Sequence, residues 1–396
     1  NVVGSGILSL SAGVAAFSSN PAALWPSTFL MAVPLGLLSA YTYYLVGQQC
    51  EESGTKSYGE AWGKLINQRS GKIITALVSI ECLSGCVGYT MILGDAFSLM
   101  LSAFLPAPLA SRSACILALT LFVLLPLSRM QSFAPLAKFS LLGTFGTVFT
   151  AGFMGLRYIQ GAYAGPGARF VGLVAPAPLS PHSPWLPNVN SLILASIFST
   201  AYMAHFNAPR MFQELKSPTL PAGQDSPEER KRRKLRLYAQ VVFSGYGAVI
   251  LLSTFVMAVG FLTFGSAAQG NILDSYSARD PLAAIARFAV AMSVLFGHPL
   301  QFVGFRDGVS QLLGEGRVPG ALLLASATLI AIAVRDLGQV QAFKGALVSV
   351  FLIFVAPSLM GMSSAKSNFT KARHGLVAAL GLLLAAAGVF VSARGS

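Results

Sequence analysis

Long apolar runs recur along the whole of this chain, and they limit its possible folds more than any other feature. Segments of about twenty mostly apolar residues alternate with short polar loops, as in membrane-spanning helices. Hydrophobic residues make up 54% of the 396 and charged residues only 10%, a balance that excludes an ordinary soluble domain. The runs do not alternate in polarity, as the strands of a membrane barrel would. The sequence therefore predicts an all-α polytopic membrane protein.

The lengths of these runs predict about eleven transmembrane helices. One shorter segment, 55–65, is polar and aromatic, and it fits a helix at the membrane interface rather than a span. The predicted spans are residues 1–18, 23–47, 73–104, 112–128, 138–157, 189–208, 237–265, 281–305, 318–334, 338–361 and 374–393.

The Lys and Arg residues predict the orientation of the chain. If the N-terminus lies in the cytoplasm, the cytoplasmic loops hold 19 of the 27 Lys and Arg residues, as the positive-inside rule requires. The run from Arg230 to Arg236 dominates this bias, and it serves either as a topological anchor or as a site for anionic lipid. The net charge of +13 is therefore a topology signal, and we expect no nucleic-acid partner. The loops are 48–72, 129–138, 209–236, 306–319 and 362–373.

The first span contains Gly4-Ser5-Gly6, which is unsuited to an uninterrupted helix. Glycine costs about 1 kcal/mol in a helix interior, and in a membrane each freed backbone group needs a partner. A break is tolerated where it lines a cavity, and the N–H groups from Gly4 to Ile7 would then receive a carboxylate. The alternative is that Gly4 and Gly6 only permit close helix packing. Because only three residues precede the break, we expect the native chain to begin earlier.

The sixth span has a corresponding interruption in its small, polar stretch from Phe198 to His205, which Pro209 follows. Two interrupted helices at corresponding positions are the best sequence indication of a transport site. Carbonyl and hydroxyl groups between Ser199 and Tyr202 would bind an ammonium group, with Phe198 beside them.

The positions of these breaks divide the chain into two five-helix halves and two smaller parts. The first half is 1–157 and the second is 189–361. Between them, 158–188 is a Pro-rich external loop that we expect to be extended. The last part, 362–396, contains a cytoplasmic loop and the eleventh helix.

Several short motifs occur in order over nearly the whole chain. They are Asn1 with Gly4-Ser5-Gly6-Ile7-Leu8, Ser57-Tyr58-Gly59-Glu60-Ala61, His205 with Glu214-Leu215-Lys216, the run from Gly260 to Gly265 with Asn271-Ile272-Leu273 and Tyr276, and Pro299 before Arg306. Together they resemble the amino acid/auxin permease family, particularly its neutral and vacuolar amino-acid transporter branch. The resemblance implies a five-plus-five inverted repeat with broken helices 1 and 6, and amino-acid transport coupled to protons or sodium.

Ionisable residues within spans are costly, so each is a functional candidate. Glu81, Asp95, His205 and His298 qualify, although Glu81 could instead pair with a basic loop residue. Either histidine could titrate near neutral pH and couple protons, or it could simply donate one hydrogen bond.

Three further residues of the spans have predicted positions or roles. Tyr89 could close a substrate pocket with its hydroxyl, or it could only pack. Arg287 and Lys344 lie near external ends, where we expect them to snorkel to the surface.

The coupling ion follows from the groups available in helix 8. A sodium site between helices 1 and 8 needs several oxygen ligands, and Asn1 and Ser293 are the candidates. Ser293 is the single hydroxyl between Ala289 and Pro299, where His298 could instead exchange a proton. We therefore expect protons rather than sodium.

The sequence predicts a monomeric secondary active transporter that moves amino acids in the plasma membrane or a vacuolar or other endomembrane, with lipid as its surroundings. The alternatives are a sodium-coupled symporter and an amino-acid sensor with little transport. No phosphate loop, metal cluster or nucleophile elbow indicates an enzyme. We expect no cofactor, no bound metal, and free thiols at Cys50, Cys82, Cys86 and Cys115.

A cysteine introduced at Gln224 tests the orientation. If the loop 209–236 is cytoplasmic, an impermeant thiol reagent labels this cysteine only after the membrane is permeabilised. Labelling in intact cells would show that the chain has the opposite orientation.

Overall fold

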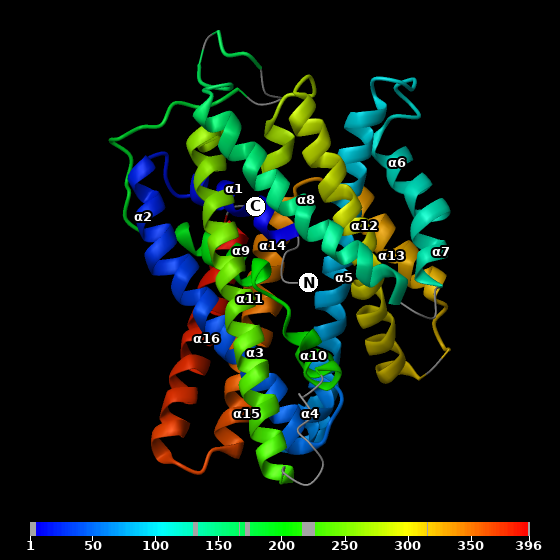
Figure 1. The fold of residues 1–396 in the computed structure, drawn as a ribbon, viewed down its shortest axis with the longest axis vertical. Coiled ribbons are helices and arrows are strands. Elements are labelled where there is room, and N and C mark those ends of the chain that lie inside the picture. Colours follow the sequence, from blue (N-terminus) through cyan, green and yellow to red (C-terminus); the bar gives the residue numbers. More distant parts are fainter. Residues whose placement is uncertain are drawn as a thin grey trace.

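The computed structural model describes residues 5–129, 134–165, 167–170, 175–215, 226–314 and 316–394. Within these ranges the chain forms helices and no strands. Figure 1 shows an elongated bundle whose longest helices run roughly side by side along its long axis. The helices α4, α10 and α15 lie at one end, which is cytoplasmic in the predicted orientation, and the loop after α8 lies at the other.

The helical segments follow the predicted spans, with short 3₁₀ and π-helical stretches inside several of them. The first half contains η1 (Ser5–Ser9), α1 (Leu10–Ala15), η2 (Pro21–Ala23), α2 (Leu24–Pro26), η3 (Ser27–Ala32), α3 (Val33–Ser53), α4 (Tyr58–Leu65), α5 (Gln68–Leu101), α6 (Arg112–Leu119), η4 (Thr120–Leu124), α7 (Leu125–Ser128) and α8 (Ala134–Ile159). The rest contains α9 (Ser191–Ala201), η5 (His205–Asn207), α10 (Ala208–Glu214), α11 (Pro227–Phe264), η6 (Gly265–Ala267), η7 (Ile272–Ser275), α12 (Pro281–Leu313), α13 (Gly320–Ala333), α14 (Leu337–Lys344), η8 (Gly345–Ser349), η9 (Phe351–Val355), α15 (Ala356–Ser364) and α16 (Asn368–Arg394).

Six helical stretches among the described residues are long and apolar enough to cross a membrane. Shorter apolar helices occupy three further predicted spans, Gly6–Ala15, Arg112–Ser128 and Gly320–Ala333. The all-α polytopic class is thus confirmed, whereas the total of eleven spans, the inverted repeat and the division into halves stay predictions. The long stretches are Pro21–Ser53, Gln68–Leu101, Glu228–Ala267, Pro281–Leu313, Leu337–Ser364 and Asn368–Phe390.

Local sequence signals explain where several helices begin and end. Ser226 and Glu229 form a capping box at the start of α11, so two free backbone N–H groups gain side-chain partners. Gly54 ends α3 in the left-handed conformation, with φ of 64°, that glycine adopts at no steric cost. The predicted interfacial segment contains the short helix α4, which the Ser57 side chain caps.

Small residues allow the central helices to approach closely. The helix α12 packs against both α5 and α8. A Cβ atom on Gly304 of α12 would lie 2.7 Å from the sulfur of Cys82 on α5. In a bilayer, such close van der Waals packing is a main force that holds helices together.

The described part of the Pro-rich loop contains turns at 160–163 and 181–182 as well as irregular segments, and it is fastened to the residues just after α1. Asn20 donates hydrogen bonds to the carbonyls of Pro181 and Ser183, at 2.7 and 3.0 Å. Asn188 donates to the carbonyl of Phe17 at 3.2 Å. Hydrogen bonds therefore join the Pro-rich loop, which we predict to be external, to the chain after the first broken helix.

A buried ion pair fixes the outer ends of α8 and α12. Arg157 donates to both carboxylate oxygens of Asp280, at 2.8 and 2.7 Å, and Tyr163 donates to the same carboxylate at 3.1 Å. Burial of Asp280 opposes its ionisation, but these bonds and the Arg157 charge outweigh it, so the pKa of Asp280 lies below its ordinary value of 3.8. The charge of Asp280 therefore stabilises the fold above that value, and this contribution is lost as the pH falls through the lowered pKa.

We predict that Asp280→Asn destabilises the protein by about 3–5 kcal/mol, because it leaves Arg157 buried without its counter-ion. The matched control is Asp307→Asn, which breaks the exposed pair of Arg306 and Asp307 and should cost less than about 1 kcal/mol. Thermal unfolding of the purified variants measures both effects. Equal melting temperatures for the two variants would contradict the role assigned to Asp280.

Candidate functional site

The two interrupted helices meet in the middle of the bundle. The helix α9 ends at Ala201, and the chain passes through Tyr202, Met203 and Ala204 before η5 begins. The 3₁₀ segment η1 packs against α9, and a Cβ atom on Gly6 would lie 2.7 Å from Cα of Ala201. Gly6 therefore permits close packing between the breaks, as the structural alternative for this motif required.

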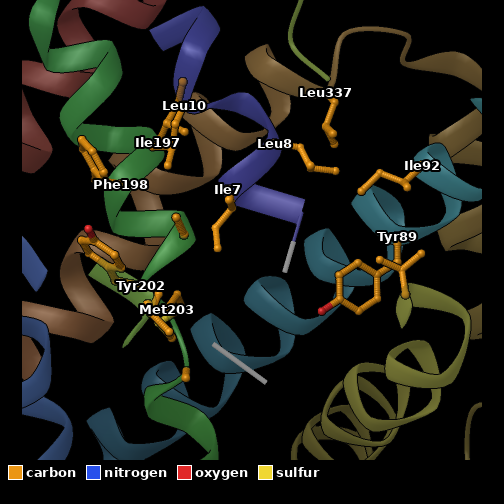
Figure 2. Close-up of a cluster of buried hydrophobic side chains, with 14 of the residues drawn as sticks. Ile7, Leu8, Leu10, Tyr89, Ile92, Ile197, Phe198, Tyr202, Met203 and Leu337 are labelled. Carbon is orange, nitrogen blue, oxygen red and sulfur yellow. The ribbon is translucent and has the colours of Figure 1, made fainter. Parts of the chain in front are cut away.

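Apolar side chains surround this meeting point (Figure 2). Ile7 from η1 and Phe198, Tyr202 and Met203 from the second break are all buried, and the rings of Phe198 and Tyr202 stack with centroids 5.5 Å apart. Tyr89 from α5 lies across from them, and a Cβ atom on Gly297 of α12 would lie 3.3 Å from its ring. The structure thus brings together the predicted residues of helices 1, 3 and 6.

The hydroxyl groups at the second break bond to the scaffold. Ser199 donates to the carbonyl of Ala195 at 2.9 Å, one turn earlier in α9. Tyr202 donates to the carbonyl of Ala32 at 3.1 Å, and Tyr246 of α11 donates to the carbonyl of Tyr202 at 2.9 Å. Tyr246 therefore satisfies a carbonyl at the break, a role that sequence reasoning missed. Substrate binding by Ser199 and Tyr202 stays a prediction.

His205 lies directly after the second break and is fully buried. Its Nε2 atom is 3.0 Å from Oγ1 of Thr42. Because Thr42 donates its single proton to the carbonyl of Leu38 at 3.0 Å, we assign the imidazole proton to Nε2. The Nδ1 atom then carries a lone pair, and it has no partner among the described residues.

The predicted groups of helix 8, Ser293 and His298, both lie on α12. His298 is 1% exposed, stacks on Phe302 and has no partner for Nε2 within the described part of the chain. Ser293 is half-buried on the same helix. Asn1 and Gly4 lie outside the described residues, as does the side chain of Ser5, so their roles stay predictions.

An open cavity of about 1190 Å³ lies toward the predicted external side of these breaks. Ala12 of α1 and Ile197 of α9 contribute to its wall, together with Ser84 of α5 and Lys344 of α14. The cavity thus reaches the outer half-helices beyond both breaks. Asp95 also lines it, and its carboxylate accepts a bond from Arg112 at 2.6 Å.

Asp274, in the loop segment η7, is a second acidic residue in the cavity lining. Its burial and the nearby Asp95 charge raise the pKa of Asp274 to about 7, against the opposing effects of Arg287, Asn271 and Arg112. A group of this kind exchanges protons near neutral pH. Sequence reasoning included its neighbours in a motif but not Asp274 itself.

The expectation that Arg287 and Lys344 snorkel to the surface is wrong. Arg287 is 2% exposed, and its guanidinium donates to the carbonyls of Leu273 and Tyr276 at 2.9 and 2.6 Å. Lys344 forms an ion pair with Glu81, with 2.7 Å between Nζ and Oε1. Both cations face inward because buried acceptors offset their desolvation. Opposite charges in two separate spans were the available sequence signal for the second pair.

A family model described as "Transmembrane amino acid transporter protein" matches residues 1–396. The putative sodium-coupled neutral amino acid transporter 11 of Danio rerio is 25% identical, with 99% of this chain and 82% of that protein covered. Vacuolar amino acid transporter 5 of Schizosaccharomyces pombe is 24% identical, with 72% and 64% covered.

Solved structures share the fold at low identity. Mhp1 in an inward-facing conformation has a TM-score of 0.61 at 13% identity, with 99% of this chain and 86% of that chain covered. A manganese transporter of Eremococcus coleocola has a TM-score of 0.54 at 15% identity, with 99% and 87% covered.

We predict that Gly6→Ala destabilises the protein by about 1–3 kcal/mol, because its methyl group would overlap the Ala201 backbone. The matched control is Gly247→Ala on α11, where an added Cβ atom meets nothing within 4 Å. Thermal unfolding compares the two variants. If Gly6→Ala melts with the control, the two breaks do not touch as described.

Proposed function

Since the chain belongs to the transmembrane amino acid transporter family, we propose that it is a proton-coupled amino-acid transporter whose substrate binds where the two broken helices meet. Family membership confirms the resemblance seen in the sequence, and it makes the chain an integral membrane transport protein and not an enzyme. The binding place, the driving ion and the monomeric state are proposals.

The main support for this binding site is the contact between η1 and the end of α9, next to the outer half-helices that line the cavity. The first N–H groups of a helix have no intrahelical partners. At η1 these are the groups around Gly6, and they favour a carboxylate together with the positive end of the helix dipole. In the unwound stretch after Tyr202, the carbonyl of Met203 favours the ammonium group. A zwitterionic amino acid offers both charges, so it matches this pair of helix ends.

Proton coupling draws support from two buried histidines that each have an unpartnered nitrogen atom, His205 after the second break and His298 on helix 8. Nδ1 of His205 and Nε2 of His298 are buried without hydrogen-bond partners in the described structure, and an imidazole nitrogen atom can carry or release a proton. Asp274, which lines the cavity, has a pKa of about 7. Ser293 is the single hydroxyl that helix 8 offers a sodium ion near these groups. Sodium is the alternative, because several relatives carry the name sodium-coupled transporter.

The test is amino-acid uptake by proteoliposomes that contain the purified protein. We predict uptake that continues when choline replaces sodium at fixed pH and stops when a protonophore collapses an inward proton gradient. A panel of neutral, acidic and basic amino acids identifies the substrate class, and protein-free liposomes are the control.

Each other outcome has a distinct meaning. Loss of uptake in choline, with indifference to the proton gradient, would establish sodium coupling instead. Saturable binding of an amino acid without uptake under any gradient would indicate a sensor.

A further inference from the structure

A buried ion pair crosses from α5 to the end of α14, within the membrane-spanning part of the bundle. Nζ of Lys344 lies 2.7 Å from Oε1 of Glu81, and Ser349 of η8 donates to Oε2 of Glu81 at 2.9 Å. The side chain of Lys344 is 7% exposed and that of Glu81 is 2% exposed. Glu81 lies about 20 Å along α5 from its start at Gln68, and Lys344 about 10 Å along α14 from Leu337. Glu81 therefore lies well inside α5, and Lys344 lies where α14 continues directly into η8.

Charges at such a position are expensive, and replacing a buried ion pair with apolar residues is often neutral or stabilising. Ionisable residues within spans therefore mark functional sites by default. The other buried pair, Arg157 and Asp280, ties an external loop to a helix end. The pair of Glu81 and Lys344 ties down no loop, so its position calls for another explanation.

The surroundings of Lys344 connect it to the transport route. Lys344 lines the open cavity, whereas its partner Glu81 is not among the lining residues. The next residue, Gly345, packs on the backbone of Ser196 in α9, and the Thr200 hydroxyl donates to the carbonyl of Gln341 at 2.8 Å. The helix α14 thus packs against α9 just before the break in that helix, and it also packs against η1.

We propose that Lys344 is a docking site for the substrate carboxylate in the outer cavity. We further propose that Glu81 takes up a proton when the substrate carboxylate replaces it as the partner of Lys344. This inference rests on the proposed proton-coupled transport of amino acids. It places the first contact of the substrate in the cavity, before the substrate reaches the broken helices.

The linkage between the two ligands follows from charge. A proton on Glu81 without substrate leaves the Lys344 ammonium buried with no counter-ion. A substrate carboxylate without that proton places two carboxylates on one ammonium. Each ligand therefore binds more tightly in the presence of the other, and this coupling is reciprocal. When the substrate moves on, Lys344 recovers Glu81 and the proton is released.

Ser349 suits both states of Glu81. It donates to the carboxylate in the present structure. A serine hydroxyl can also rotate and accept a hydrogen bond, so it would accept from the protonated carboxyl group. The protonated form is thus not left without a partner.

Other ionisable groups lie in the same cavity or on the elements around this pair. The cavity lining also includes Asp95, Asp274, Arg335 and Asp336. The buried thiols of Cys82 and Cys86 lie on α5 itself, and α12 contributes His298 and the exposed Asp307. Asp307 lies beside Arg306, 3.3 Å away. Lys344 is the cation that directly contacts Glu81.

The key variant exchanges the two residues, Glu81→Lys with Lys344→Glu. A purely structural ion pair would survive the exchange, but the cavity wall would then present a carboxylate. We expect a normally folded protein whose substrate affinity falls about tenfold or more, because a charge-assisted hydrogen bond is replaced by repulsion. Binding is measured by isothermal titration with the amino acid that the wild-type protein transports.

A second variant, Glu81→Gln, imitates the protonated state. We expect it to exchange substrate across the membrane without a gradient, while proton-driven accumulation is lost. If it is unstable because Lys344 is unpaired, the uncharged double variant Glu81→Gln with Lys344→Gln replaces it. The double variant should fold and bind substrate more weakly than the wild-type protein, because position 344 no longer offers a positive charge to the substrate carboxylate.

The outcomes separate this inference from the proposed function. Wild-type uptake that ignores the proton gradient would overturn the proposed function itself. Proton-driven wild-type uptake, together with unchanged affinity in the exchanged and the uncharged double variants, would overturn only the docking site.

Discussion

A backbone inside a bilayer has no water to bind, so each unwound turn must find partners within the protein. The structure of this chain depends on that constraint where η1 meets the end of α9. Gly6 brings the two backbones together at Ala201, and Tyr246 supplies a hydroxyl to the carbonyl of Tyr202. The neighbouring helices therefore preserve the breaks, and the groups that remain unpaired are the ones available to a ligand.

The fold class could be predicted because its signals are local. The length of apolar runs gives the spans, and glycines or small polar residues give the breaks near Gly6 and Tyr202. The candidate site was predictable only as a neighbourhood. The sequence cannot tell that the hydroxyls of Ser199 and Tyr202 turn to the scaffold, because the partners of a flexible polar side chain depend on the helices packed around it.

The buried cations show the same limit more sharply. Arg287 and Lys344 resemble snorkelling residues when only distance from a helix end is considered. Their partners lie on other elements: Arg287 binds the carbonyls of the loop around Leu273, and Lys344 binds Glu81, far away in the sequence. A pairing of this kind becomes visible only when charges in different spans are considered together.

The positions of the charged groups also distinguish ion pairs that fix loops from an ion pair that borders the cavity. Near the predicted external end, Arg157 with Asp280 and Arg287 with the carbonyl of Leu273 in η7 fix loops to helix ends. Arg157, Asp280 and Arg287 are not among the residues that line the open cavity, whereas Lys344 is. A charge pair that a ligand can reach can change partner at little cost, because the incoming charge replaces the lost one. Fixed loops around the pair that we propose to exchange partners would let the cavity respond to substrate while the scaffold keeps its shape.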